Sequence, residues 1–410
     1  MTRILHIEKF VRRDRGGASA YMFEVMDRQR RAGNEVEVFG MANPDNEPTR
    51  YGDRFAPQVQ LDPPPPGARA KAQTALRMVW SRPAADALAD VVDDFRPDVV
   101  HCHNIYHQLT PSILGPVSDR SIPTVMTVHD FKLVCPTYHL IDHQGNDCTE
   151  CVGGSVLPLL RKRCEAGSLA KSTVLAVEAT VHRRRRSYGS IAAFLCPSRF
   201  MVDQLIAGGF PSERIRHLPN AVTIPTDGDP TGRPAPGRHL VFVGRLIHRK
   251  GVDLLIDAIA PLHDVTLTVC GDGPERAVLE ERARSLGGRV DFVGHVDHHR
   301  ICTELVKAAA LVLPSRGSEN QPLSILEAFA NGVPAIASDS APTRELVEPG
   351  TTGLVFPGGD VAALTATLTE LVSDPDRQAT MARAAWELAC TDHDMSSHVA
   401  SLDRVYAEAG

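Results

Sequence analysis

Short apolar runs alternate with stretches of helical periodicity along most of the chain. A short apolar run predicts a buried strand, and apolar residues at i, i+3 and i+4 predict a helix. In the first half, this pattern predicts strands at 4–7, 36–39, 98–101, 124–128 and 191–196, and helices at 18–31 and 198–207. Strands that alternate with helices indicate a parallel sheet covered on both faces.

The second half repeats the alternation after a break. The expected strands are 240–243, 265–270, 290–293, 311–313 and 334–337, and the expected helices are 252–260, 274–286, 300–308 and 323–331. Residues 223–237 are rich in Pro, Gly and Asp and lack apolar periodicity, so we expect a linker there. Residues 42–67, with Pro63–Pro66, predict a long irregular loop. The sequence therefore predicts two α/β domains, 1–222 and 238–393.

Composition and charge narrow the class of protein. The chain has 410 residues, 43% of them hydrophobic and 23% charged, which suits two or three globular domains. No apolar run approaches the ~20 residues that span a bilayer. A net charge of −6 argues against general nucleic-acid binding. Met1–Ile7 predicts a first strand and not a signal peptide, so we expect a cytoplasmic protein.

Two carboxylates flank the start of the helix expected at 323–331. Glu319 lies in the loop before this helix and Glu327 lies within it. The N–H groups at a helix start can bind an anion, and the helix dipole favours it. A carboxylate in the loop can accept hydrogen bonds from hydroxyl groups beside that anion. The segment therefore indicates a site for a sugar joined to a diphosphate.

Two cations follow the strand expected at 240–243. Arg245 comes directly after Gly244, and Lys250 precedes Gly251 and the next helix. Arginine offers a forked set of donors and lysine a point charge, and both suit a pyrophosphate. Basic residues in loops are most often only solvated. The two cations indicate a diphosphate site only in combination with the segment that holds Glu319 and Glu327.

Together these segments resemble the retaining glycosyltransferases of family 4, which have the GT-B fold. The resemblance covers roughly the C-terminal half through 244–246, 250–251, 271–274, 292–294, 319–327 and 331–334. It is looser in the N-terminal half, at 16–17, 101–104, 129–130, 197–198 and 219–220. It implies two Rossmann-like α/β/α domains that face each other across a cleft, with the acceptor side in 1–222 and the nucleotide sugar in 238–393. It also implies that residues 394–410 pack back on the first domain.

The resemblance assigns roles residue by residue. Catalytic roles fall on Glu319, Arg245, Lys250 and His129. Donor binding falls on Gly16, Gly17, Gly244, Asn320, Gln321, Leu323, Ser324, Glu327 and His295, and His103 is a candidate on the acceptor side. The implied activity is a metal-independent hexosyl transfer, without a catalytic cofactor, from a nucleotide diphosphate sugar to a glycan, lipid-linked or small-molecule acceptor. The alternatives are a GT-B phosphorylase or epimerase and a nucleotide-sugar-binding protein without activity.

Two further features stand outside that resemblance. Cys135, Cys148, Cys151 and Cys164 are spaced by twelve, two and twelve residues. In a cytoplasmic protein this pattern favours metal ligands over disulfides, and the open alternatives are structural zinc, an iron–sulfur cluster, free thiols and one disulfide formed under oxidising isolation. The run Arg183–Arg186 is usually a solvated face, but could also contact anionic lipid at the inner membrane surface.

Overall fold

The computed structural model describes residues 1–61, 63, 65–233 and 237–410. The chain forms two compact units: unit 1 comprises Met1–Leu218 and Val399–Gly410, and unit 2 comprises Pro219–His398. The expected linker, 223–237, groups with unit 2, and its residues 234–236 lie outside the described residues, as does Pro64 of the proline run. The domain boundaries at 222 and 238 stay predictions.

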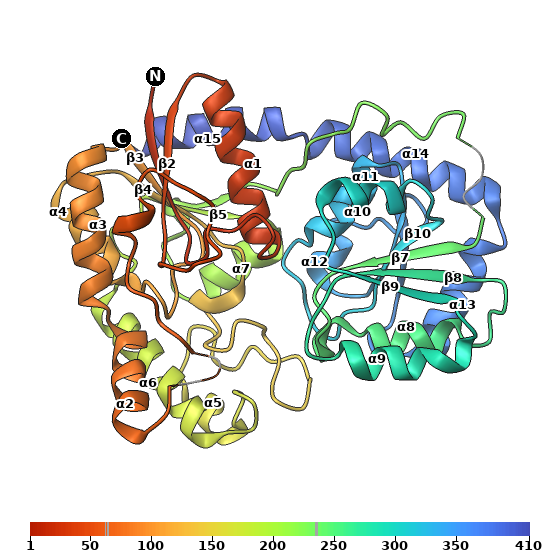
Figure 1. The fold of residues 1–410 in the computed structure, drawn as a ribbon, viewed down its shortest axis with the longest axis horizontal. Helices are drawn as coiled ribbons and strands as arrows, with labels where there is room; N and C mark the ends of the chain where they lie inside the picture. The colour runs from red at the N-terminus through yellow and green to blue at the C-terminus, as the bar shows by residue number, and fades with distance from the viewer. Residues whose placement is uncertain (62, 64, 234–236) are drawn as a thin grey trace. The chain divides into compact units, whose positions relative to one another are not determined.

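Unit 1 is a six-stranded parallel sheet with helices on both faces (Figure 1). The strands are β1 (Arg3–Ile7), β2 (Glu35–Phe39), β3 (Val99–Cys102), β4 (Thr124–Thr127), β5 (Ala193–Cys196) and β6 (Ile215–His217), in the order β2-β1-β3-β4-β5-β6. The helices are α1 (Gly17–Arg31), α2 (Ala68–Val79), α3 (Arg82–Phe95), α4 (Leu114–Asp119), α5 (Leu157–Lys162), α6 (Leu169–Arg185), α7 (Arg199–Ala207) and most of α15 (Met395–Ala409). β3, β4 and β5 are buried along their whole length, as strands covered on two faces must be.

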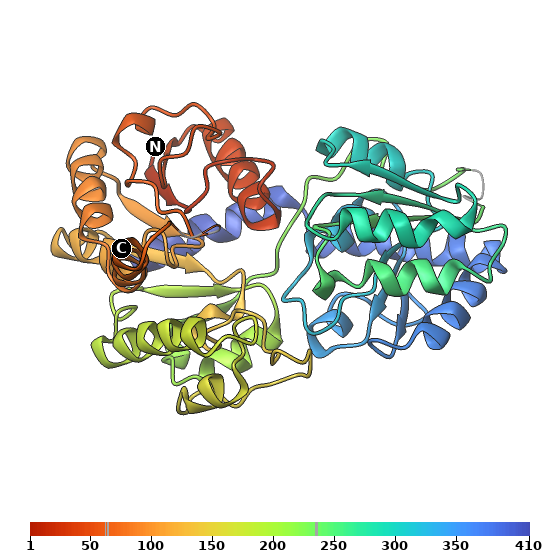
Figure 2. The same ribbon diagram turned by 60° about the horizontal axis from the view of Figure 1, so that its bottom comes forward.

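Unit 2 is also a six-stranded parallel sheet between layers of helices (Figure 2). Its strands are β7 (His239–Val243), β8 (Thr266–Cys270), β9 (Val290–Gly294), β10 (Ala310–Leu313), β11 (Ala335–Ser338) and β12 (Gly353–Phe356), in the order β12-β11-β10-β7-β8-β9. Its helices are α8 (Val252–Ile259), α9 (Arg276–Ala283), α10 (His298–Leu305), α11 (Leu323–Ala330), α12 (Ala341–Arg344), α13 (Val361–Val372) and α14 (Pro375–Asp392). Counted within the unit, this is the Rossmann order 3-2-1-4-5-6, whose direction reverses between β7 and β10.

Short 3-10 helices occur in the loops of both units. They are η1 (Gly52–Arg54), η2 (Pro111–Ile113), η3 (Phe131–Leu133), η4 (Ser212–Arg214), η5 (His248–Lys250) and η6 (Arg284–Leu286). The expected α/β fold is confirmed, and each expected strand and helix corresponds to an observed one with ends that differ by a few residues. The helix expected at 274–286 is shorter: α9 ends at Ala283, and η6 forms its last turn.

Candidate active site

The carboxyl ends of β7 and β10 lie side by side at the point where the strand order of unit 2 reverses. Ligands bind at such a point in open α/β sheets, because the loops leave the two strands in opposite directions. η5 follows β7, and residues 314–322 follow β10. Gly251 joins the two segments: its φ is 67°, and a Cβ there would lie 2.0 Å from the carbonyl oxygen of Pro314. Only glycine allows this approach, which brings Lys250 beside the β10 loop.

Glu319 is the centre of a charged cluster in this loop. Its Oε1 accepts hydrogen bonds from Lys250 Nζ at 2.9 Å, Arg249 Nη1 at 3.0 Å and Ser315 Oγ at 2.8 Å. Burial alone would raise the pKa of Glu319, but the charges of Lys250 and Arg249 outweigh it and lower the pKa to about 2. The carboxylate is therefore ionised at neutral pH, and the two cations leave the cluster with one excess positive charge.

An arginine fixes η5 against the β10 loop. Arg316 forms a forked ion pair with Asp253 on α8, with both nitrogen–oxygen distances at 2.7 Å. Its Nη1 also donates to the carbonyl of His248, and its backbone N–H donates to the carbonyl of Arg249. Because both carbonyls belong to η5, Arg316 and Asp253 hold the turn that carries Arg249 and Lys250.

The start of α11 completes this part of unit 2. Pro322 precedes the helix, and no side chain among the described residues caps it, so the N–H groups of Leu323 and Ser324 can bind an anion. The approach to the helix is fixed by Asn220, whose N–H donates to Gln321 Oε1 and whose Nδ2 donates to the Gln321 carbonyl. The neighbouring Asn320 is buried.

Glu327 lies further along α11 and has a partner that the sequence did not indicate. His298 Nδ1 on α10 is 3.4 Å from Glu327 Oε1. Hydrogen bonds to Cys302 and Glu327 raise the pKa of His298. The Glu327 side chain is mostly buried, with 17% of it exposed, and its role in donor binding stays a prediction.

The other donor candidates of unit 2 lie in the loops after β7 and β9. Arg245 is exposed and, in contrast to Lys250, forms no side-chain ion pair with another described residue. Gly244 donates its N–H to the carbonyl of Cys270, and His295 is exposed just after β9. The cation that joins Lys250 at Glu319 is thus Arg249, which the sequence analysis did not select. The roles of Arg245 and His295 toward a donor stay predictions.

Asp-x-Asp triplets, which hold metal ions in many proteins, occur at 227–229, 374–376 and 392–394. One aspartate of each triplet accepts a hydrogen bond from a backbone N–H group. Asp229 accepts from Thr231, Asp374 caps α14 by accepting from Arg377, and Asp394 accepts from Ser397. These hydrogen bonds assign the triplets to turns and helix starts, whereas the charge at Glu319 is balanced by lysine and arginine.

In unit 1, the candidates lie after β1, β3 and β4. Gly16 has a φ of 106° and is the N-cap of α1, which begins at Gly17 without a side-chain cap. Glu8, directly after β1, is a buried carboxyl that the sequence analysis missed, and it accepts a hydrogen bond from the backbone of Asn104 at 3.0 Å. Burial raises the pKa of Glu8 to about 7, so its proton can exchange near neutral pH.

His129 ends a row of hydrogen-bonded side chains that crosses unit 1. His103 Nδ1 lies 3.0 Å from His129 Nε2, and His103 Nε2 lies 3.0 Å from His6 Nδ1. His6 Nε2 lies 2.8 Å from Gln29 Oε1, and Gln29 Nε2 donates to the hydroxyl of Tyr406. Gln29 Oε1 can only accept, so His6 Nε2 carries the proton and His6 Nδ1 accepts. His103 Nε2 therefore donates to His6, and His129 Nε2 donates to His103. His103 is fully buried, so any effect on an acceptor passes through His129.

These histidines are neutral in the folded protein. Burial lowers the pKa of His6 to about 4 and that of His129 to about 3. The nitrogens of His6, His101 and His103 lie within 4.8 Å of one another, close enough to suggest a metal site. However, His101 Nδ1 and Nε2 hydrogen-bond to Tyr406 and Thr127, both at 2.8 Å. Since both nitrogens of each ring have partners, the geometry favours a hydrogen-bonded row over metal ligation.

The arginine run Arg183–Arg186 closes α6 and is exposed. Arg183 donates to the carbonyls of Cys151 and Gly154, and the guanidinium of Arg185 lies 4.8 Å from the centre of the Trp80 ring. Two of the four arginines thus have partners within unit 1. Among the helices of the described residues, none combines the length and apolar character needed to cross a membrane.

Comparison with known proteins places the chain in a family. Residues 15–224 match the family described as "Glycosyltransferase Family 4", and residues 225–387 match "Glycosyl transferases group 1". Alpha-D-kanosaminyltransferase of Streptomyces kanamyceticus is 33% identical over 177 residues, which cover 42% of this chain and 46% of that protein. The chain thus spans about half the length of the curated relatives it matches.

Solved structures share the fold over the whole chain. Sucrose-phosphate synthase from Thermosynechococcus elongatus has a TM-score of 0.73 at 18% identity, covering 100% of this chain and 99% of that chain. HepE of Anabaena, solved with UDP-glucose, has a TM-score of 0.67 at 18% identity, covering 100% of both chains. The two α/β units therefore have the GT-B fold, and the chain belongs to glycosyltransferase family 4, among the group 1 glycosyltransferases.

Proposed function

We propose that this protein transfers a sugar from a nucleotide diphosphate sugar to a hydroxyl group of its acceptor, with retention of the anomeric configuration. The observation that carries this proposal is the Glu319 cluster at the carboxyl ends of β7 and β10. It places two cations, an ionised carboxylate and the first turn of α11 on adjacent loops. The family relationship, and the UDP-glucose bound by HepE, support a nucleotide sugar as donor.

The cluster suggests how the donor would be recognised. A bound diphosphate can form ion pairs with Arg249 and Lys250, which pair with Glu319 in this structure. Glu319 would then accept hydrogen bonds from sugar hydroxyl groups next to those cations. Negative charge grows on the leaving diphosphate in the transition state, so the cations would lower the barrier as well as bind the donor. This chemistry requires no catalytic metal or other cofactor.

His129 of unit 1 is the candidate for contact with the donor sugar. The hydrogen bond to His103 holds its ring, and desolvation lowers its pKa so that it is neutral. A neutral imidazole can hydrogen-bond to a sugar hydroxyl without placing a second charge beside the reacting carbon. The unbridged cysteines suit a reducing compartment, and we therefore propose a cytoplasmic enzyme whose exposed Arg184 and Arg186 could contact anionic lipid.

Hydrolysis of radiolabelled donors tests the proposal. Purified enzyme is incubated with UDP-, GDP- and ADP-sugars, and release of the sugar is measured for the parent and for Lys250→Ala and Arg249→Ala. We expect release from at least one donor, and a loss of about 100-fold in each variant because a contact to the leaving group is removed. Arg238→Ala, at an exposed ion pair with Asp264, is the control. Donor binding without any turnover would favour the non-catalytic alternative.

A further inference from the structure

The segment between η3 and α6 has little regular secondary structure. Over residues 134–156, the one β-bridge among the described residues joins Ile141 and Asp147, and backbone hydrogen bonds also join Phe131 to Tyr138 and Cys148 to Leu140. Its backbone takes up left-handed conformations at non-glycine residues such as Tyr138 and Leu140. Among the described residues, a small buried cluster of Cys151, Leu159, Leu175 and Ala176 lies in this part of unit 1, with Val156, Leu160 and Cys164 packed against it. Long irregular loops of this kind need another constraint to hold one conformation.

All four cysteines of this segment line one small cavity. Its wall also includes Leu140, Ile141 and Leu159, and the enclosed space is about 10 Å³, about the room that one water molecule or one ion needs. Cys135 and Cys151 are 7% and 8% exposed, and Cys148 and Cys164 are half-buried. Residues spread over thirty positions of sequence thus line the same cavity. Their sulfur atoms are less closely grouped than the ring nitrogens of His6, His101 and His103, the one group of three or more possible ligands within 4.8 Å of one another among the described residues.

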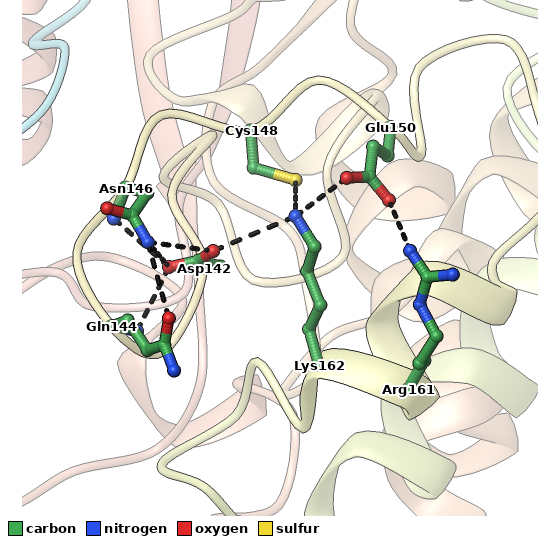
Figure 3. A network of polar contacts seen from close by, with 7 residues as sticks. All are labelled: Asp142, Gln144, Asn146, Cys148, Glu150, Arg161 and Lys162. Carbon is green, nitrogen blue, oxygen red and sulfur yellow. Dashed lines mark hydrogen bonds and ion pairs between the residues drawn. The ribbon is translucent and has the colours of Figure 1, made fainter.

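A lysine beside the cavity can donate to a sulfur ligand. Lys162 Nζ on α5 lies 3.5 Å from Cys148 Sγ and 2.7 Å from Glu150 Oε1. Both contacts are drawn in Figure 3. Asp142 lies on the other side of Lys162 and shapes the turn before Cys148, because its Oδ1 accepts from the backbone of Gln144 and Asn146 (Figure 3). Metal-bound thiolates are commonly stabilised by such surrounding hydrogen bonds.

An arginine from α6 ties the cysteine loops together. Arg183 donates to the carbonyl of Val134, which directly precedes Cys135. It also donates to the carbonyls of Cys151 and Gly154, at the end of the Cys148–Cys151 pair and just after it. The backbone of Leu159 hydrogen-bonds to Cys151. These contacts hold the two cysteine-bearing turns close to each other, as the two halves of a four-cysteine metal site require.

We propose that Cys135, Cys148, Cys151 and Cys164 bind a single structural zinc ion. Four thiolates in tetrahedral arrangement are a preferred zinc site. An iron–sulfur cluster held by the same four thiolates is the outcome that metal analysis separates from zinc. None of the nine cysteines, all within the described residues, forms a disulfide. Binding requires the thiols to lose their protons, and these leave to solvent as zinc enters.

The site would order the segment that follows His129. Lys132 on η3 donates to the carbonyl of Pro136 and pairs with Glu178 at 2.8 Å, and its Nζ lies 4.8 Å from the centre of the Tyr138 ring. Because these contacts join the cysteine segment to η3, loss of zinc would loosen η3 two residues after His129. The zinc has a structural role, and this inference does not depend on the proposed transfer activity.

Metal analysis of the full chain tests the inference. Protein produced in zinc-containing medium and purified without chelator is measured by inductively coupled plasma mass spectrometry. We expect about one zinc per chain in the parent and loss of nearly all of it in Cys148→Ser. Cys390→Ser on α14 removes a half-buried thiol in unit 2 and should keep its zinc.

A second measurement on the parent protein guards against a variant that fails to fold. Iodoacetamide labelling is followed peptide by peptide, with and without a high-affinity zinc chelator. We expect the four cysteines to be protected together and to become reactive together when zinc is removed. Reduced, folded protein with no zinc and four independently reactive thiols overturns the proposal, and so does iron with visible absorbance or a mapped disulfide among the four.

Discussion

Replacing Glu319 with glutamine tests the electrostatic account of the cluster most directly. The variant keeps the shape of the side chain and removes its charge, so Arg249 and Lys250 lose their counterion. The pKa of Glu319 is lowered from 4.5 to about 2, which corresponds to about 3 kcal/mol of favourable interaction with the ionised form. We therefore expect Glu319→Gln to reduce the free energy of unfolding of unit 2 by about 3 kcal/mol at pH 7.

The two tryptophans allow each unit to be followed separately. Trp386 lies on α14 of unit 2, and Trp80 lies between α2 and α3 of unit 1. In a Trp80→Phe background, urea unfolding followed by tryptophan fluorescence reports on unit 2. Glu281→Gln is the control, because Glu281 pairs with Arg284 at the surface with 63% of its side chain exposed, and such pairs contribute about 0–1 kcal/mol.

The pH dependence has a definite sign. Since the pKa is lower in the folded state, the contribution of Glu319 is complete above about pH 4.5 and is lost as the pH falls toward about 2. The difference between parent and Glu319→Gln should therefore be constant from pH 7 to 5 and shrink to about half at pH 3. A variant as stable as its parent at pH 7, or a difference that does not shrink in acid, would refute the reasoning.

Other predictions concern the surrounding contacts. Asp253→Asn breaks the forked pair with Arg316 and should raise the KM for the donor about tenfold, measured by initial rates with the exposed Asp264→Asn as control. Transfer should survive a brief incubation with EDTA; activity lost with the fold intact and restored only by Mg²⁺ or Mn²⁺ would contradict a metal-independent step. Unit 1, followed through Trp80 in a Trp386→Phe background, should lose stability as the pH falls from 6.5 to 4, because unfolded chains bind protons that buried His6 and half-buried His129 do not. Stability that stays flat over this range would show that these histidines titrate alike in both states.

The sequence predicted those features that depend on residues close together along the chain. Alternation of apolar and periodic segments predicted five of the six strands of each sheet and missed β6 and β12. The place of Lys250 after a strand predicted a cation for a diphosphate, and the structure shows that this cation pairs with Glu319. Arg245 and Arg249 lie in the same loop, and the sequence did not indicate that Arg249 pairs with Glu319; the role of Arg245 toward a donor stays a prediction. Which of them reaches Glu319 depends on the turn of η5 and on the close approach of Gly251 to Pro314, neither of which is visible in residue type.

Contacts between distant segments could not be predicted from the sequence, because they also depend on how the chain folds. His6, Gln29 and Tyr406 carry no motif, and their row exists because β1, α1 and α15 pack side by side in unit 1. Likewise, the cysteine spacing suggested a common site, but only the fold shows that the four thiols line one cavity. Glu8 was missed because a carboxylate at a strand end is ordinary until its burial is known.

The place of Tyr406 in unit 1 has a consequence for biosynthesis. Residues 399–410 belong to the unit that the chain begins, while the whole of unit 2 lies between them and Leu218. A chain emerging from the ribosome can complete unit 2 before the hydroxyl of Tyr406 is available to Gln29 and His101. Domains commonly fold in order from the N-terminus during synthesis. In unit 1, however, the row of hydrogen-bonded side chains is complete only after Tyr406 has been synthesised. A nascent or prematurely terminated chain would therefore carry a finished second domain beside an incomplete first one.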